Sequence, residues 1–165
     1  WLNCLNGNVP GDTVDPPNTA IQSVDYRTTG VLKQLPDELV AAISEKMGYM
    51  PKRYDAASQA TTDAAGAVVS VGKLWIPTEM EIFGTSVHGA SGYGVCGGAQ
   101  YPLFYTKEHI PKVISGTNEH GIWWLASARN NSKTSFTAIS KLGTGTQFTA
   151  NTTGHYVPIC FRISE

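Results

Sequence analysis

The last third of the chain alternates apolar residues with small polar ones. From Trp123 it reads WWLASARNNSKTSFTAI, and it continues in Ser, Thr, Gly and Asn as far as the closing YVPICFRI. Such alternation is typical of half-buried strands, because successive side chains point to opposite faces of a sheet. We therefore expect strands at 122–127, 135–140 and 156–163, with a hairpin turn in the segment KLGTGT.

The first regular element that the pattern predicts is a helix. A proline followed by two acidic residues opens a segment in which Leu39, Ile43 and Met47 recur at every fourth position, and Gly48 follows. Proline and acidic side chains favour a first helical turn, the spacing places apolar residues on one face, and glycine favours a stop. The pattern predicts a helix over 35–47.

The middle of the chain changes to β-branched and aromatic residues. Residues 66–77, which read GAVVSVGKLWIP, predict a hairpin or strand pair centred near Gly72, and 78–81 predict one short helical turn. Segments rich in Gly with Pro, Asn or Ser at 5–22 and 84–98 predict irregular loops. The sum is an α+β fold with one or two helices, a mostly antiparallel sheet and long loops.

Size and charge restrict the class of protein. A chain of 165 residues fits a single domain over 1–165. Only 15% of the residues are charged and the net charge is −1, so we expect no nucleic-acid partner. No stretch is long or apolar enough to span a bilayer, and we expect no membrane insertion. Because the chain opens on Trp1 without an initiator Met, we expect it to be the C-terminal part of a longer protein.

The charges are distributed unevenly. No Asp or Glu lies between Glu119 and Glu165, whereas four Lys or Arg residues do. The last third is therefore mildly basic. This favours anionic or neutral partners, with a Coulomb attraction that salt weakens.

The three cysteines and four histidines form no metal or catalytic motif. No two of Cys4, Cys96 and Cys160 stand at metal-ligand spacing, and their odd number leaves at least one thiol free in the monomer. We expect Cys160, in an apolar run, to be a small buried residue and Cys96, in GVCGG, to be more exposed. Whether any two of them pair stays open. We expect no metal site, no cofactor and no enzymatic activity.

Five separated blocks carry a resemblance to a known group of proteins. They are spread over most of the chain and comprise residues 30–43, 73–84, 101–104, 123–127 and 157–163. The pair LWIPTEMEIFG and WWLAS is specific when both occur in this order. The chain resembles the bacterial and phage C-type-lectin-like domains of uncharacterised function, a group that overlaps with the variable proteins of diversity-generating retroelements. The resemblance implies a C-type lectin-like fold.

The closing block departs from the pattern of that family. Family members usually end G-V-x-P-x-F-x-I, whereas here Tyr156 stands where Gly is expected and Ile159 where Pro is expected. Pro158 comes one position early. The strand geometry of the family is therefore not carried over to these positions.

The resemblance also implies a function. In family members that a retroelement diversifies, the C-terminal segment forms a solvent-facing ligand surface on a rigid frame. By this resemblance the chain is a calcium-independent receptor-recognition module, extracellular, on a virion such as a phage tail or on a bacterial cell surface. Its partner is a protein or glycan receptor, and it forms a homo-oligomer or part of a larger assembly. The ligand face is assigned to Trp123, Ser127, Arg129, Asn130, Asn131, Ser132, Lys133, Thr134, Gln147, Thr149, Asn151, Thr152, His155 and Tyr156.

Calcium-dependent sugar binding requires clustered oxygen ligands that this sequence lacks. Such lectins use a Glu with an Asn a few residues on, and an Asp after a Trp-Asn pair, and neither occurs here. Glu79 and Glu81 are interpreted as structural or capping carboxylates. The same broad fold hosts cysteine-oxidising enzymes, which need two reactive thiols in one groove, and nothing beside Cys96 or Cys160 indicates a low thiol pKa.

A second hypothesis from another class stays open. The chain is then a structural or decoration module of a virion or cell-surface assembly, and its polar C-terminal face is merely solvated. The two Trp residues of WWLAS cannot both lie fully in the core, because the side chains of adjacent strand residues point to opposite faces of a sheet. We expect one to pack in the core and the other to lie under a loop or line the ligand surface.

Overall fold

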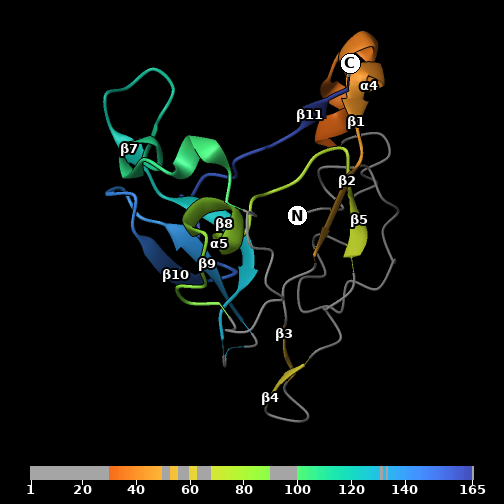
Figure 1. Ribbon diagram of the computed structural model, residues 1–165. Helices are drawn as coiled ribbons and strands as arrows, with labels where there is room; N and C mark the ends of the chain where they lie inside the picture. Colours follow the sequence, from red (N-terminus) through yellow and green to blue (C-terminus); the bar gives the residue numbers. More distant parts are fainter. Residues whose placement is uncertain are drawn as a thin grey trace. The chain divides into compact units, whose positions relative to one another are not determined.

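The computed structural model describes most of the chain beyond its N-terminal part. The described residues are 30–49, 53–55, 60–62, 68–89, 100–130, 132 and 134–164. Within them the fold is α+β, with short helices and small antiparallel sheets, as predicted (Figure 1). The chain groups into two compact units, one from 1–48, 69–75 and 159–165 and the other from 49–68 and 76–158. The single domain stays a prediction.

The first unit is built on strand pairs between distant segments. Its elements are η1 (Val31–Gln34), α4 (Asp37–Ala42), β1 (Ile43–Ser44), β2 (Lys46–Tyr49), β5 (Val68–Gly72) and β11 (Arg162–Ile163). β1 pairs antiparallel with β11, and β2 lies beside β5. Trp75 and Cys160 exchange two backbone hydrogen bonds of 3.0 and 2.9 Å.

Two predicted elements of this unit differ from the structure, the first in its extent and the second in its pairing. The helix expected over 35–47 ends at Ala42, and Ile43 is buried at 2% exposure and opposite Ile163. The hairpin expected near Gly72 is instead the single strand β5, whose partner β2 lies upstream. In both cases a pairing with a distant segment outweighs the local pattern, and a local pattern carries no information about a distant partner.

The second unit contains the main sheet. Its helices are α5 (Glu79–Phe83), η3 (Pro102–Phe104) and η4 (Lys107–His109), and its strands are β3 (Arg53–Asp55), β4 (Ala60–Thr62), β6 (Lys112–Val113), β7 (His120–Gly121), β8 (Trp123–Ala128), β9 (Ser135–Ile139) and β10 (Gly145–Thr149). β8, β9 and β10 form one antiparallel sheet in the order β10-β9-β8. β3 pairs with β4, and β6 with β7.

Of the three strands predicted in the last third of the chain, the first two are confirmed. Strands β8 and β9 occupy the two expected segments, and the predicted hairpin turn joins β9 to β10. The third predicted strand, 156–163, is wrong in extent. Only Arg162–Ile163 is regular strand, while Tyr156 and Cys160 form isolated bridges.

The short helix α5 covers one face of the sheet (Figure 1). Thr78 and Glu81 form a capping box at its start, and Gly84 ends it in the left-handed conformation at φ 71°. Its Ile82 packs in a core with Trp123 and side chains from neighbouring elements, which are Phe104, Ile110, Leu125 and Ile139. The helical turn predicted at 78–81 is confirmed. Its Ile82 covers the core on one side of β8.

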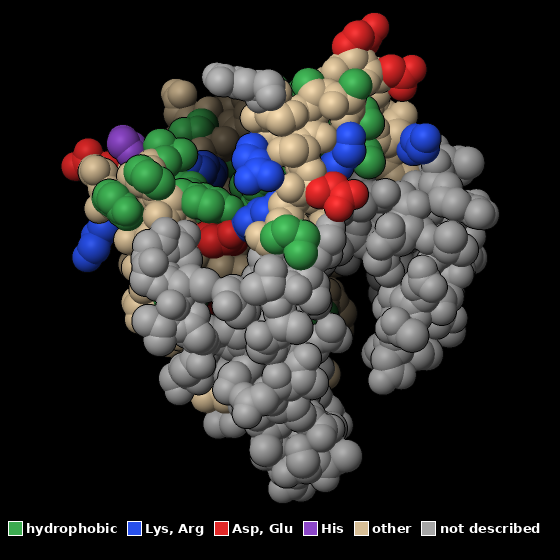
Figure 2. All heavy atoms as spheres, turned by 45° about the vertical axis from the view of Figure 1, so that its right-hand side comes forward, with side chains coloured by type: hydrophobic (Ala, Val, Ile, Leu, Met, Phe, Trp, Pro, Cys, Tyr) green, Lys and Arg blue, Asp and Glu red, His purple; other side chains and the backbone are tan. Residues whose placement is uncertain are grey.

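Some apolar side chains of the second unit remain exposed. Leu103, Tyr105, Val113 and Leu142 are each more than half exposed. Figure 2 shows hydrophobic side chains of the described residues at the surface, with Lys and Arg side chains on the same face. Scattered exposed apolar side chains are normal for soluble domains and require no partner. No helix within the described segments is long and apolar enough to cross a membrane.

Candidate ligand-binding tip

One end of the main sheet brings two connecting segments together. β9 begins opposite the end of β10, with Ser135 paired to Thr149. Arg129 follows β8 directly, and its N–H donates to the Ser135 carbonyl at 3.0 Å. The described residues of 129–134 therefore lie beside 149–152, and we call these two segments the tip. Asn131 and Lys133 lie outside the described residues.

The first segment of the tip is fixed by a serine side chain. Ser132 Oγ accepts hydrogen bonds from the N–H groups of Ser135, at 3.1 Å, and Thr134, at 3.3 Å. Ser and Thr hydroxyls commonly close turns in this way, because they satisfy backbone donors that the turn leaves unpaired. Ser132 therefore satisfies the backbone N–H groups of Thr134 and Ser135 at the start of β9.

The second segment joins the first through its backbone. The Ala150 N–H donates to the Thr134 carbonyl at 2.8 Å, and the Thr152 N–H donates to the Thr149 carbonyl at 2.9 Å. The hydroxyl oxygens of Thr149 and Thr152 are 3.2 Å apart. The tip thus displays short polar side chains on a hydrogen-bonded backbone. Those exposed to solvent are Arg129, Thr134, Thr149 and Asn151, and those half-buried are Asn130, Ser132 and Thr152.

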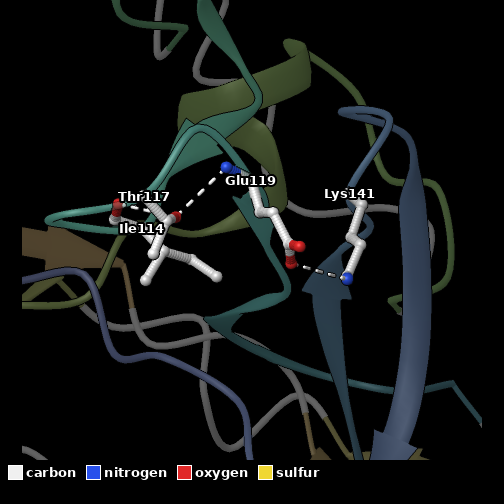
Figure 3. Close-up of polar contacts among 4 residues, drawn as sticks. All are labelled: Ile114, Thr117, Glu119 and Lys141. Carbon is white, nitrogen blue, oxygen red and sulfur yellow. Dashed lines mark hydrogen bonds and ion pairs between the residues drawn. The ribbon is translucent and has the colours of Figure 1, made fainter.

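The described part of the tip carries a cation and no carboxylate. Glu119, the last acidic residue before Glu165, lies 3.9 Å from Lys141, in the turn at the opposite end of the β9–β10 hairpin (Figure 3). The turn that presents Glu119 is closed by Thr117 Oγ1, which accepts from the Glu119 N–H at 3.1 Å and donates to the Ile114 carbonyl at 3.0 Å. The carboxylate of Glu119 therefore lies away from the tip.

Two residues assigned to the ligand face lie in the interior. Trp123 is 2% exposed and belongs to the core under α5. Ser127 is 6% exposed, and its Oγ accepts from the Glu79 N–H at 3.0 Å. The alternating sequence pattern separates the two faces of β8 but does not show which face packs on the core. Neither side chain can contact a ligand at the surface of this structure.

Gln147 also differs from the expected position. It is half-buried, and its Oε1 atom is buried without a hydrogen-bond partner among the described residues. Gln147 pairs with the buried Thr137 in the sheet, so its side chain shares the core side of β10. Its side chain is therefore not part of the exposed surface of the tip.

His155 forms an aromatic cluster on the other side of the sheet. Its ring lies 4.3 Å from the Phe148 ring and 5.2 Å from the Trp124 ring, measured between centroids. Trp124 is 4% exposed beneath this cover. Of the two alternatives predicted for the second Trp, lying under a loop or lining the ligand surface, the structure shows the first, because His155 of the segment after β10 covers Trp124. The His155 Nδ1 atom is buried without a partner among the described residues.

Tyr156 lies at the opposite end of β8 from the tip. Its N–H donates to the Ile122 carbonyl, and its carbonyl accepts from the Trp124 N–H, each at 2.9 Å. Its ring lies against Gly121, where an added Cβ would come within 2.7 Å of the ring. A six-residue strand spans about 20 Å. The structure therefore gathers part of the predicted face at the tip and places His155 and Tyr156 elsewhere.

The predicted role of the two carboxylates of α5 is confirmed. Glu81 Oε2 accepts from the Thr78 N–H at 2.8 Å, and its Oε1 accepts from the Tyr101 hydroxyl at 2.8 Å. Glu79 is 2% exposed and accepts from backbone N–H groups of segment 86–89. Glu81 thus caps α5, and Glu79 holds segment 86–89.

A cationic cluster in the first unit was not visible in the sequence. Lys46 Nζ lies 4.8 Å from the centre of the Trp75 ring. Burial lowers the pKa of Lys46 to about 8, with an opposing contribution from the Cys160 thiol and a further lowering by Arg162. Cys160 is half-buried, less than expected. More than a hundred residues separate Lys46 from Cys160, so no local motif could have indicated this contact.

Comparison with known proteins adds no family to this description. No protein-family model, no curated protein and no solved structure matches the chain. Over the described part of the chain, no three His, Cys, Asp or Glu side chains are grouped so as to hold a metal ion.

Proposed function

We propose that this chain is a calcium-independent, non-enzymatic recognition module of the C-type-lectin-like class, which binds a protein or glycan receptor through the tip. The observation that carries the proposal is the juxtaposition of segments 129–134 and 149–152 at one end of the β8–β9–β10 sheet. Both segments present small hydroxyl and amide side chains, and Arg129 adds a cation.

The chemistry of the tip supports recognition. Hydroxyl and amide groups both donate and accept hydrogen bonds, and Ser, Thr and Asn lose little rotamer entropy when a partner orders them. Their backbone is held by the bonds of Ser132 and Ala150, so less freedom is lost on binding. Similar side chains are enriched in antibody binding loops for the same reasons. The tip thus has the features of a preorganised polar binding surface.

The setting of the proposed module follows from the resemblance. The module belongs on a virion or bacterial cell surface, in a homo-oligomer or a larger assembly, with the tip directed at the receptor. Diversification of this segment is part of the proposal. Sequencing of the encoding locus in many isolates tests it: substitutions concentrated at Asn, Ser and Thr codons of 127–156, beside an invariant template copy, support it, and uniform drift contradicts it.

The binding itself is tested with an array of bacterial surface glycans and surface proteins. The labelled chain is applied once with calcium and once with EDTA. The proposal predicts a defined set of bound receptors that is the same in both conditions. An array on which the folded chain binds nothing would favour the alternative function, a structural module of a virion or surface assembly. Binding that EDTA abolishes would contradict calcium independence.

A further inference from the structure

We infer that Glu79 is the positioning residue of the tip. In this inference its buried carboxylate fixes segment 86–89, and this segment fixes the backbone at Arg129 and Asn130. The importance of the tip for binding rests on the proposed function, whereas the positioning itself does not depend on any ligand.

The carboxylate of Glu79 is surrounded by backbone donors. Its Oε2 accepts from the N–H groups of Val87, at 3.1 Å, and Gly89, at 2.9 Å, and its Oε1 accepts from the His88 N–H at 3.0 Å. The Ser86 hydroxyl lies 3.4 Å from Oε2. Hydrogen bonds to an ionised acceptor are stronger than neutral ones, and a buried carboxylate requires such partners. The side chain therefore holds three successive N–H groups in one conformation.

Segment 86–89 in turn holds the start of the tip. The His88 carbonyl accepts from the Asn130 N–H at 2.9 Å, and Gly89 forms an antiparallel bridge with Arg129. On the other side, His88 Nε2 lies 3.2 Å from the Gly145 carbonyl of β10. Segment 86–89 therefore contacts both the start of the tip at Arg129 and Asn130 and the strand β10, which leads to the second segment of the tip.

Glu79 also contacts β8 directly. Its own N–H donates to Ser127 Oγ at 3.0 Å, and the Ser127 carbonyl accepts from Thr137 Oγ1 at 3.0 Å. A Cβ at position 89 would lie 2.8 Å from Glu79 Oε2 and 3.4 Å from the Ala128 carbonyl. The close approach of carboxylate and backbone thus explains the glycine at this position. One side chain connects α5, segment 86–89 and the end of β8.

Glu81 provides a matched control on the same helix. Its carboxylate also accepts a backbone N–H, that of Thr78, and a hydroxyl, that of Tyr101, but the hydrogen bonds of segment 86–89 go to Glu79. Replacing either Glu by Gln removes one charge and one carboxylate oxygen. In E79Q the amide NH₂ faces N–H donors, because both carboxylate oxygens accept from that segment. If Glu79 only stabilised the fold, as Glu81 does, E79Q and E81Q would have similar effects on the tip.

Amide hydrogen exchange measured by NMR distinguishes the two roles. In E79Q we expect the amides of Val87, Gly89 and Asn130 to exchange at least about tenfold faster than in the unmodified chain, because local opening becomes easier. The sheet amides of β9 and β10 should change no more than in E81Q. If E79Q does not fold, E79D, which keeps the charge but shortens the side chain, should show the same selective acceleration. Equal tip exchange in the Glu79 variant and E81Q, or no acceleration, would overturn the inference.

The same variants separate this inference from the proposed function. The exchange measurement needs no ligand, so it decides the positioning role even if the array described above shows no bound receptor. For any array receptor that the unmodified chain binds, E79Q should bind at least about tenfold more weakly, and E81Q should bind nearly as well as the unmodified chain. Equal binding by E79Q and E81Q would show that the positioning is irrelevant to recognition.

Discussion

Lys46 carries a pH dependence at the residue scale. Burial lowers its pKa from 10.5 to about 8. Between these values the unfolded chain binds more protons at this residue than the folded chain does, so its contribution makes the free energy of unfolding rise with pH in that window. Below a pH of about 8 the full free-energy cost of burying the charged ammonium group of Lys46 is present.

The measurement is urea unfolding of the unmodified chain and of Lys46→Met between pH 7 and 10.5. We expect the unmodified chain to gain stability relative to the variant as the pH rises, because only it carries the buried ammonium. A constant difference between the two chains over the window would contradict the assigned pKa.

Gly121 is a position where the absence of a side chain matters. A Cβ there would lie 2.7 Å from the Tyr156 ring and 3.2 Å from Ile114 Cγ1. We expect Gly121→Ala to destabilise the fold by about 1–3 kcal/mol, as overpacking does. In a Tyr156→Ala background the same change should cost less than about 1 kcal/mol, because its main obstacle is gone. Equal costs in thermal unfolding of the two backgrounds would show that the ring does not press on Gly121.

At the scale of elements, α5 depends on its capping box. Thr78 Oγ1 accepts from the Glu81 N–H at 3.3 Å, and the Glu81 carboxylate accepts from the Thr78 N–H at 2.8 Å. We expect Thr78→Ala to lower the free energy of unfolding by about 1 kcal/mol, and Thr78→Ser, which keeps the hydroxyl, by much less. Chemical denaturation of both variants measures this. A loss as large for Ser as for Ala would assign the effect to the methyl group instead.

The sheet and the tip should tolerate substitution differently. Leu125 and Ile139 are buried in the core, so changing either to Ala should cost about 2–5 kcal/mol. Thr134→Ala and Asn151→Ala remove exposed side chains and should stay within about 0.5 kcal/mol.

Ser132 is an exception within the tip. Its Oγ accepts two backbone N–H groups, and we expect Ser132→Ala to cost about 1 kcal/mol. A denaturation series over the core and tip variants checks these values together. Losses at Thr134 and Asn151 as large as those in the core would make the exposed tip side chains part of the fold rather than a ligand surface.

At the scale of the whole molecule, local pattern predicted local structure. The period of two located β8 and β9, and the turn residues located the hairpin to β10, because these features depend on neighbours in sequence. The helix over 35–47 failed at Ile43, whose partner Ile163 is 120 residues away. Pairings of this kind depend on the complete fold, which a window of sequence does not contain.

The candidate site could be predicted only in part for the same reason. The small polar residues around Asn130 and Thr152 indicated a surface, and the structure brings them together. The alternation could not say which face of β8 meets α5, so Trp123 and Ser127 were assigned to the ligand although both are buried. Tyr156 lies away from the tip because the path of the chain after β10 leads to the far end of β8, where Tyr156 pairs with Trp123.

The central claim is that the tip binds the receptor, and an affinity titration tests it most directly. The unmodified chain is compared with a tip variant, Arg129→Ala with Asn151→Ala and Thr152→Ala. A control, Lys141→Ala with Leu142→Ala, removes one cation and one exposed side chain at the opposite end of the hairpin. We predict that the tip variant binds its array-identified receptor at least about tenfold more weakly, a loss of about 1.4 kcal/mol, while the control binds as the unmodified chain does. Equal affinity of the tip variant, the control and the unmodified chain would contradict the account.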